Sequence, residues 1–240
     1  MKLPVSGVNF FARRKLPDMS HFIGRYSYLP HYINKFKPET LLEVGTWTGQ
    51  HAVEMIEVAL KHQQFVRYYG FDLFDNITDE QILTEQSKAR CSLKETATRL
   101  QNLKNRYPGR VNFELIRGNT HDTLAKFKSI YPVDFIFIDG GHSLSTINND
   151  FFWTSQMMQP NKTIMLLDDY YANNSLLGCK PLIDRLQKEK AFDAQVLGQT
   201  DVFPKPTGEL RIQFARVIKT GVAEVIPEAP EPAKPIVEDI

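Results

Sequence analysis

The sequence has little of three features, and each shortage excludes a class of protein. Its 240 residues include only two cysteines, Cys91 and Cys179, which give no disulfide framework and suit a reducing compartment. No apolar run approaches the ~18–20 residues that span a bilayer. The formal net charge is +1, from 29 basic and 28 acidic residues, so no long-range field gathers nucleic acid or anionic membrane. We therefore expect a cytoplasmic protein without nucleic-acid or membrane partners, and a homodimer stays open.

Proline is most frequent at the end of the chain. Residues 219–240 contain prolines at 227, 230, 232 and 235 with acidic residues between them, which excludes a helix and a hydrogen-bonded strand. We expect a solvated, extended tail there, with a docking peptide as the alternative. The rest of the chain is predicted to form an N-terminal helical extension over residues 1–39 and one domain over residues 40–218.

Short apolar segments alternate with longer amphipathic ones in the central domain. Two apolar segments, 135–138 and 163–167, are continuous, which is typical of parallel strands covered on both faces. The alternation predicts an α/β doubly wound fold, with the last two strands as an antiparallel pair at the sheet edge. The predicted strands are Thr40–Val44, Arg67–Asp72, Val111–Arg117, Val133–Ile138, Thr163–Leu167, Phe192–Leu197 and Leu210–Ile218, and the predicted helices are Gln50–His62, Asp79–Tyr107, Thr120–Ile130, Ser143–Met158 and Pro181–Lys190.

A glycine-bounded turn follows the first predicted strand. Ligands of open α/β sheets bind at the carboxyl ends of strands, and Gly45 permits the backbone angles of a sharp bend there. Gly49 lets the next helix begin close to a ligand. The spacing Glu43-x-Gly45-x-x-x-Gly49 lacks the second close glycine that cradles a dinucleotide pyrophosphate, so a nicotinamide oxidoreductase is disfavoured. A purely structural turn is the alternative.

Acidic residues end three of the other predicted strands. Asp72 follows the glycine turn by about two dozen residues and is placed to accept hydrogen bonds from a ribose diol; the alternative is a turn starter. Asp139 ends one buried strand, and Asp168 and Asp169 end the next. Like charges in one place are costly without a counter-charge, which Mg²⁺ with its preference for oxygen ligands would supply. Ordinary caps and turns are the alternative.

These motifs together resemble a known family. Glu43-x-Gly45-x-x-x-Gly49 followed by Asp72 is similar to the S-adenosylmethionine-binding half of class I methyltransferases. The runs 138–143 and 167–170 resemble the small-molecule O-methyltransferases of the catechol and macrocin type, many of which are metal-dependent. The resemblance covers about residues 40–171. It implies a Rossmann-like, mostly parallel seven-stranded sheet whose last strand is antiparallel.

The resemblance also implies roles for single residues. His142 stands where the catechol-type enzymes have a lysine as the proposed base, and an imidazole accepts protons near neutral pH. A histidine that only orders the helix start beside Ser143 is the alternative. The resemblance implies a divalent cation held by Asp139, Asp168 and Asp169, and S-adenosylmethionine held by Glu43, Gly45, Thr46, Trp47, Gly49, Asp72, Asn119 and Asp139. Packing for Trp47 and a plain turn for Asn119 are the alternatives.

The predicted function is transfer of a methyl group to a hydroxyl of a small molecule of phenol, catechol or sugar type, assisted by a divalent metal. Moving a proton from an aliphatic alcohol (pKa ~15.7) to imidazole costs ~12 kcal/mol, against ~5 kcal/mol from a phenol. Methylation of an aliphatic hydroxyl would therefore need more stabilisation of the oxygen by the metal than methylation of a phenol would. The alternatives are a metal-independent enzyme acting on nitrogen or another acceptor, and a methyltransferase-like binding module.

Overall fold

The computed structural model describes residues 23–85, 89–129, 131–205 and 208–222. A seven-stranded sheet forms its centre in the order β3-β2-β1-β4-β5-β7-β6, in which β7 runs antiparallel to both β5 and β6 and the other neighbouring strands are parallel. The predicted doubly wound α/β fold with an antiparallel last strand is confirmed. The strands are β1 Thr40–Val44, β2 Val66–Asp72, β3 Val111–Arg117, β4 Phe135–Ile138, β5 Ile164–Tyr171, β6 Phe192–Lys205 and β7 Gly208–Lys219.

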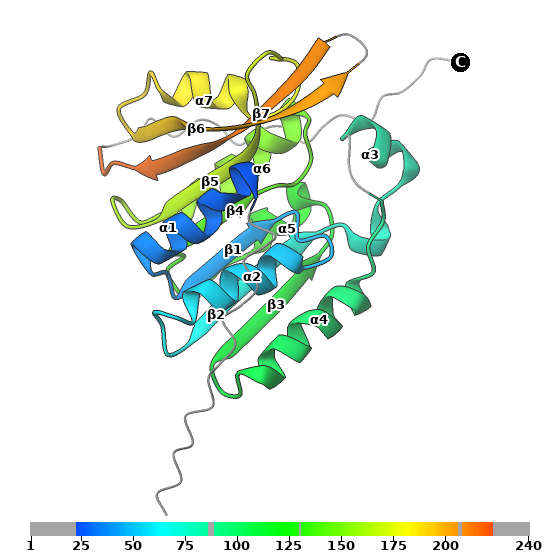
Figure 1. Ribbon diagram of the computed structural model, residues 1–240, viewed down its shortest axis with the longest axis vertical. Helices are drawn as coiled ribbons and strands as arrows, with labels where there is room; N and C mark the ends of the chain where they lie inside the picture. Colours follow the sequence, from blue (N-terminus) through cyan, green and yellow to red (C-terminus); the bar gives the residue numbers. More distant parts are fainter. Residues whose placement is uncertain (1–22, 86–88, 130, 206–207, 223–240) are drawn as a thin grey trace, which may run out of the picture.

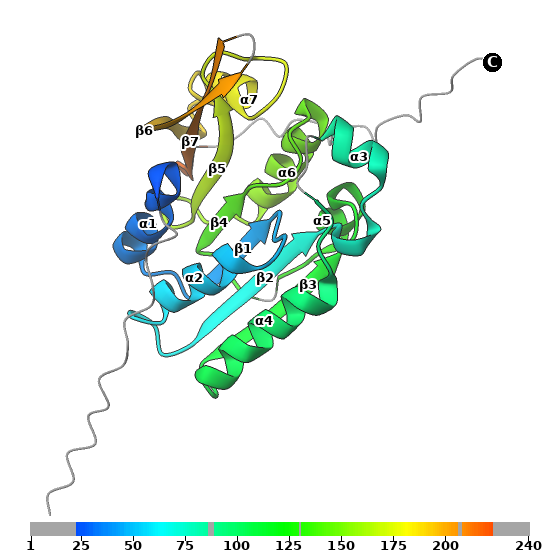
Figure 2. The same cartoon turned by 45° about the vertical axis from the view of Figure 1, so that its right-hand side comes forward.

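Helices cover both faces of the sheet (Figure 1, Figure 2). One face packs against α1, α2 and α4, and the other against α5, α6 and α7. Each layer contributes its apolar side chains to a separate core, which explains why β1 and β4 are buried along their whole length. The helices are α1 Tyr28–Phe36, α2 Gln50–Ala59, α3 Asp79–Thr84, α4 Leu93–Arg106, α5 Thr120–Lys126, α6 Leu144–Gln156 and α7 Lys180–Leu186, with short 3₁₀ helices η1 Gly24–Ser27 and η2 Phe74–Asn76.

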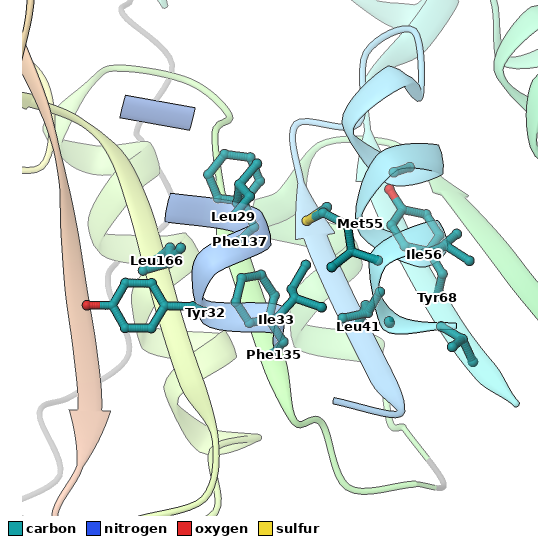
Figure 3. Packing of buried hydrophobic residues seen from close by; sticks show 14 of the residues in the cluster. Leu29, Tyr32, Ile33, Leu41, Met55, Ile56, Tyr68, Phe135, Phe137 and Leu166 are labelled. Carbon is teal, nitrogen blue, oxygen red and sulfur yellow. The ribbon is translucent and has the colours of Figure 1, made fainter. Parts of the chain in front are cut away.

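The helix α1, which belongs to the predicted N-terminal extension, is part of the central core. Leu29 and Ile33 lie one turn apart on its inner face and are fully buried. Figure 3 shows them among side chains of the sheet, including Leu41 of β1 and Phe135 of β4. This packing fixes η1, which directly precedes α1, over the sheet. Residues 1–22 and 223–240, with most of the predicted tail, lie outside the described residues.

The prediction of one long helix over Asp79–Tyr107 is wrong. The segment contains two helices, α3 and α4, separated by residues 85–92. A Thr78–Gln81 capping box starts α3, but α3 buries none of its residues. The pattern that packs on the sheet begins only in α4, where Thr96, Leu100 and Leu103 are buried. The shorter α3 stands away from the layer of α4, near the carboxyl ends of β1 and β2 (Figure 2).

Two strands run further than their apolar patterns predicted. β5 continues to Tyr171 because Tyr170 and Tyr171 pair with β7 after a shift in register. Asp168 and Asp169 therefore lie inside β5, at this irregularity, and not after its end. β6 reaches Lys205 and pairs with β7 along most of its length, so the two strands form a long hairpin.

Two absences expected from the composition apply to the described part of the chain. Both cysteines are buried and unbonded to each other. Within the described residues, none of the helices has the length and apolar character that crossing a membrane requires.

Candidate active site

The carboxyl ends of β1, β2, β3 and β4 meet at one rim of the sheet, because these strands are parallel and paired in register. A cavity opens at this rim, and α3 with the loop after β2 forms part of its wall. The predicted residues that line it are Gly45, Trp47, Asp72, Asn119, Asp139 and His142. The structure thus brings together residues that lie up to about 100 positions apart.

The glycine turn shapes the side of this cavity next to β1. Gly45 has a φ of 91°, and a Cβ atom placed on it would lie 1.9 Å from the carbonyl oxygen of Asp139. Only glycine permits this approach, which brings β1 and the end of β4 together. Gly49 also has a positive φ, of 72°, and is the N-cap of α2, but it is not among the residues that line the cavity. Gly45 therefore makes the sharp bend predicted for it, and cofactor binding by the two glycines stays a prediction.

Asp72 braces the turn through its carboxylate. Its Oδ2 accepts a hydrogen bond of 2.7 Å from the N–H of Trp47, and its Oδ1 accepts one of 2.7 Å from the N–H of Phe74. Burial raises the pKa of Asp72, while these backbone N–H groups oppose that change. A carboxylate has about four acceptor sites, so Asp72 keeps capacity for a hydroxyl group of a ligand in the cavity.

Glu43 and Thr46 lie beneath the turn and outside the wall of the cavity. Glu43 is buried in β1 and accepts a short hydrogen bond from the hydroxyl of Tyr68. The Oγ1 of Thr46 lies 3.3 Å from the same hydroxyl. Burial raises the pKa of Tyr68 well above its usual value, so Tyr68 stays a donor. These contacts support the shape of the turn, and direct cofactor binding by Glu43 and Thr46 stays a prediction.

Trp47 and Asn119 both line the cavity and also hold local structure. The Nε1–H of Trp47 donates to the carbonyl of Ala89 over 2.9 Å, which links the glycine turn to the segment before α4. Asn119 caps α5 by accepting a hydrogen bond of 3.0 Å from the N–H of His121. Both the structural and the ligand-binding interpretations of these residues are compatible with this geometry.

The three predicted metal ligands do lie together. Asp139, Asp168 and Asp169 each have a carboxylate oxygen within 4.8 Å of the other two. Asp169 has a φ of 60°, at the irregularity in β5, which allows neighbouring aspartates to face one site. We call these three residues the acidic cluster. The predicted proximity of these three carboxylates on two adjacent strands is therefore confirmed, and their role as metal ligands stays a prediction.

The acidic cluster already contains a cation, the guanidinium of Arg25 from η1. Its Nε lies 2.6 Å from Asp168 Oδ1, and its Nη2 lies 2.9 Å from Asp168 Oδ2. The hydroxyl of Tyr26 reaches Oδ2 at 2.9 Å, and the N–H of Asp169 reaches Oδ1 at 2.7 Å. These contacts fill the roughly four acceptor sites of the Asp168 carboxylate. As they stand, the residues do not fit a divalent cation that uses Asp168 as a ligand, and the cation itself stays a prediction.

Burial and neighbouring charges act in opposite directions on the ionisable groups here. Burial and the charges of Asp169 and Asp139 raise the pKa of Asp168, and Arg25 opposes this change. Burial also raises the pKa of Tyr26, and the two carboxylates beside it raise it further, so its hydroxyl stays a donor. The guanidinium of Arg25 stays charged because Asp168 raises its pKa despite burial.

His142 occupies the cavity wall with both ring nitrogens engaged. Its Nε2 lies 2.9 Å from Asp169 Oδ2, and its Nδ1 lies 3.1 Å from the hydroxyl of Tyr171. Burial lowers the pKa of His142, but the hydrogen bond and charge of Asp169 outweigh it, so the pKa is raised. Burial works against ionisation of Asp169, yet His142 lowers the pKa of that carboxyl. The pair is an imidazole oriented by a carboxylate, a common arrangement for proton transfer.

Sequence reasoning assigned no role to Arg25, Tyr26, Tyr171 or Glu85. Glu85 follows α3 and accepts a hydrogen bond of 2.8 Å from the N–H of Ser143, which closes the cavity against the start of α6. Tyr171 lies beyond Leu167, where the predicted strand ends, and after the irregularity at Asp169, so no strand pattern marks it. No local signal marks Arg25, which lies 143 positions from Asp168.

The chain matches the model of one known family, and its fold matches several solved structures. The family described as "Methyltransferase domain" matches residues 42–170, which is more than half of the chain. The chain belongs to this family. No curated protein sequence matches the chain. The predicted class, a methyltransferase of the class I type, is therefore confirmed.

Solved O-methyltransferases have the fold of this methyltransferase domain at low sequence identity. TomG from Streptomyces achromogenes, solved in complex with SAM, is 14% identical over 81% of this chain and 79% of its own, with a TM-score of 0.56. An O-methyltransferase from Bacillus cereus in complex with SAH is 16% identical over 80% and 79%, with a TM-score of 0.54. A putative caffeoyl-CoA O-methyltransferase from Staphylococcus aureus is 14% identical over 80% and 81%, with a TM-score of 0.53.

Proposed function

We propose that this methyltransferase domain transfers the methyl group of S-adenosylmethionine to a hydroxyl group of a small molecule. One observation carries the proposal: the glycine turn, Asp72, Asp139 and His142 all line a single cavity. The glycine turn with Asp72 has the features of a nucleoside site, and His142 is a proton acceptor beside the carboxylate of Asp169. Two of the similar structures, TomG and the Bacillus cereus enzyme, are complexes with SAM and SAH, which supports the choice of cofactor.

The residues around the glycine turn and Asp72 would bind the cofactor. Asp72 would accept hydrogen bonds from the ribose hydroxyls with the acceptor sites that its two backbone partners leave open. Asn119 and Trp47 lie where they could contact the base, and Gly45 leaves the space that a side chain would otherwise fill. Asp139 lines the same cavity and would place negative charge near the positive sulfonium. When bound, the cofactor supplies an electrophilic methyl group.

His142 would accept the proton of the acceptor hydroxyl. Asp169 engages Nε2 and so fixes the tautomer in which Nδ1 has the free electron pair. The hydroxyl of Tyr171 contacts that nitrogen, so a substrate would either displace this hydroxyl or pass its proton through it. The raised pKa of His142 makes it a stronger base than a free imidazole.

No step of this proposal passes through a divalent cation, because the contacts of Asp168 leave no acceptor site for one. The protein groups must then supply all of the help with deprotonation. The ~5 kcal/mol gap between a phenol and imidazole is small enough for a concerted transfer, whereas the ~12 kcal/mol gap of an aliphatic alcohol is large. We therefore expect a phenol or catechol before a sugar.

Two measurements test the proposal. Calorimetric titration with S-adenosylhomocysteine should show one site per chain. Incubation with methyl-labelled S-adenosylmethionine and a panel of phenols, catechols, sugars and amines should then label a hydroxyl compound, identified by mass spectrometry. Absence of binding would overturn the cofactor, and labelling of amines alone would overturn the hydroxyl acceptor.

A further inference from the structure

The contacts within the acidic cluster differ from those expected from the sequence. The sequence predicts a divalent cation as the counter-charge of three carboxylates, whereas the structure brings the Arg25 guanidinium to the centre of the same group. We propose that Arg25, anchored by Asp201 and assisted by Tyr26, takes the place of that cation and makes the cluster complete without a metal.

The guanidinium of Arg25 acts as a counter-ion for both carboxylate oxygens of Asp168. The guanidinium is a planar fork, and its Nε and Nη2 engage the two carboxylate oxygens side by side at 2.6 and 2.9 Å. Both side chains are almost completely removed from solvent, with 9% and 1% of their surface exposed. A divalent cation approaching Asp168 would therefore have to displace a donor and also approach a fixed positive charge.

Independent contacts with β6 hold Arg25 in this position. Its Nη1 donates to Asp201 Oδ2 over 2.7 Å, and its backbone N–H donates to Asp201 Oδ1 over 3.2 Å. Gly24, at a φ of 61°, permits this approach, because a Cβ there would lie 2.2 Å from Asp201 Oδ1. The N–H of Gln199 donates to the hydroxyl of Tyr28 over 3.1 Å. These contacts anchor η1 on the hairpin, so the guanidinium is held from both sides.

Tyr26 supplies the bridge between strands that a shared cation would otherwise make. Its hydroxyl lies 2.9 Å from Asp168 Oδ2 on β5 and 3.1 Å from Asp139 Oδ2, which follows β4. Its ring stacks on His51 at a centroid distance of 4.5 Å and meets Phe214 edge-on at 5.3 Å. The ring is therefore fixed, and the hydroxyl keeps the two carboxylates at a set separation.

One consequence rests on the proposed function. Three donors of Arg25 are committed to Asp168 and Asp201, so the guanidinium is not placed to grip an acceptor oxygen as a metal would. Proton removal then depends on His142, and the acceptor class narrows to hydroxyls as acidic as those of phenols. Chelator should leave the rate with such an acceptor unchanged.

The direct test is a titration of the full-length protein with Mn²⁺, followed by electron paramagnetic resonance of the free ion. The wild-type protein should show no site tighter than millimolar, with or without S-adenosylhomocysteine. Arg25→Met should gain one site that Mg²⁺ displaces, at least tenfold tighter than in the wild type, and Asp139→Asn in that background should abolish it. Arg67→Met is the matched control, because Arg67 pairs with Glu39 at the opposite end of β2, and it should gain nothing.

The outcomes separate this inference from the proposed function, because Mn²⁺ binding is measured without any substrate. A micromolar site in the wild-type protein that Asp139→Asn removes would overturn the inference and leave methyl transfer intact. A folded Arg25→Met protein that gains no site would overturn it as well. If Arg25→Met folds only when Mn²⁺ is added, the ion has replaced the guanidinium and the inference is supported; if it never folds, the wild-type titration decides.

Discussion

The two halves of the sheet rim are built in opposite ways. Around β1 and β2 the site is open, and backbone groups shape it: Gly45 makes room, and Asp72 is held by two amide N–H groups. Around β4 and β5 the site is mostly closed: Asp139 and His142 still line the cavity, but side chains from distant parts of the chain pair with one another, above all Arg25 with Asp168. The open half is suited to receive a ligand, and the closed half is suited to hold charges in fixed positions.

The difference also separates two kinds of buried carboxylate. Asp168 has a guanidinium on both oxygens, whereas Asp150 on α6 is fully buried beneath the rim with no hydrogen-bond partner for its Oδ2 among the described residues. A buried carboxylate with a cationic partner contributes to stability only while that partner is present. The carboxyl of Asp150 has only neutral hydrogen-bond partners in the described part of the chain, so the fold is most stable when this carboxyl is protonated. Substitutions in each half should therefore have distinguishable effects.

The largest effect is expected for His142→Gln in the closed half. Loss of the base should lower turnover of the labelled acceptor ~10²–10⁴-fold. In the wild-type protein, kcat/KM should rise with pH through a pKa above the usual value, because only the neutral imidazole accepts a proton and Asp169 raises its pKa. Asp169→Asn should move this limb to lower pH, and His62→Gln, at an exposed site, should change neither quantity. An unchanged pH profile in His142→Gln would contradict the role of the imidazole.

Arg25→Met should cause the next largest effect, on folding. Removing one partner of a buried ion pair leaves an uncompensated charge and costs about 3–5 kcal/mol. Arg67→Met, whose ion pair with Glu39 is partly exposed at 21% and 44%, should cost no more than about 1 kcal/mol. Urea denaturation at pH 7 measures both. An equal loss of unfolding free energy in the two variants would show that the buried Arg25 ion pair stabilises the fold no more than the partly exposed Arg67 ion pair.

Asp150→Asn should remove a pH dependence of stability. Burial raises the pKa of Asp150 to about 7, well above its value in an unfolded chain. The folded state therefore keeps a proton that the unfolded state releases, and this group's contribution falls as pH rises from about 4 to 7, by roughly 4 kcal/mol at most. The urea midpoint of the Asp150→Asn variant, relative to that of the wild type, should increase between pH 5 and pH 8. The exposed control Asp122→Asn should show no such increase. No relative gain would contradict the assignment.

Asp72→Asn tests the open half and should have the smallest effect. An amide cannot accept both backbone N–H bonds and a ribose hydroxyl, so affinity for S-adenosylhomocysteine should fall ~10–100-fold. Asp184→Asn on α7, where the carboxylate pairs with Lys180, should leave affinity unchanged in the same calorimetric titration. An Asp72→Asn protein that binds as tightly as the wild type would remove the ribose contact from the account.

The open half could be predicted from the sequence because its determinants are local. The strand, the glycine turn and the following helix are contiguous, and β1 and β3 end where the apolar pattern ends. The sequence pattern did not predict that the segment 79–107 forms two helices. Most of its residues are polar, so the pattern does not indicate which helical turns pack against the sheet. The extension of β5 to Tyr171 depends on its pairing with β7, and the residues of β5 alone do not indicate that pairing.

The closed half could be predicted only in part. Parallel strand ends bring Asp139, Asp168 and Asp169 together, and the need for a counter-charge follows from their proximity. Which cation supplies it depends on contacts between η1 and β6, more than 170 positions apart. Spacing along the chain carries no information on such a contact, so a metal was the natural expectation.

A crystal structure of the protein grown with S-adenosylhomocysteine would test the central claim most directly. The nucleoside should bind in the cavity, with its ribose hydroxyls on the Asp72 carboxylate and its homocysteine end directed toward Asp139 and His142. A nucleoside bound anywhere else, or a cavity closed by its own side chains at saturating concentrations of the compound, would contradict it.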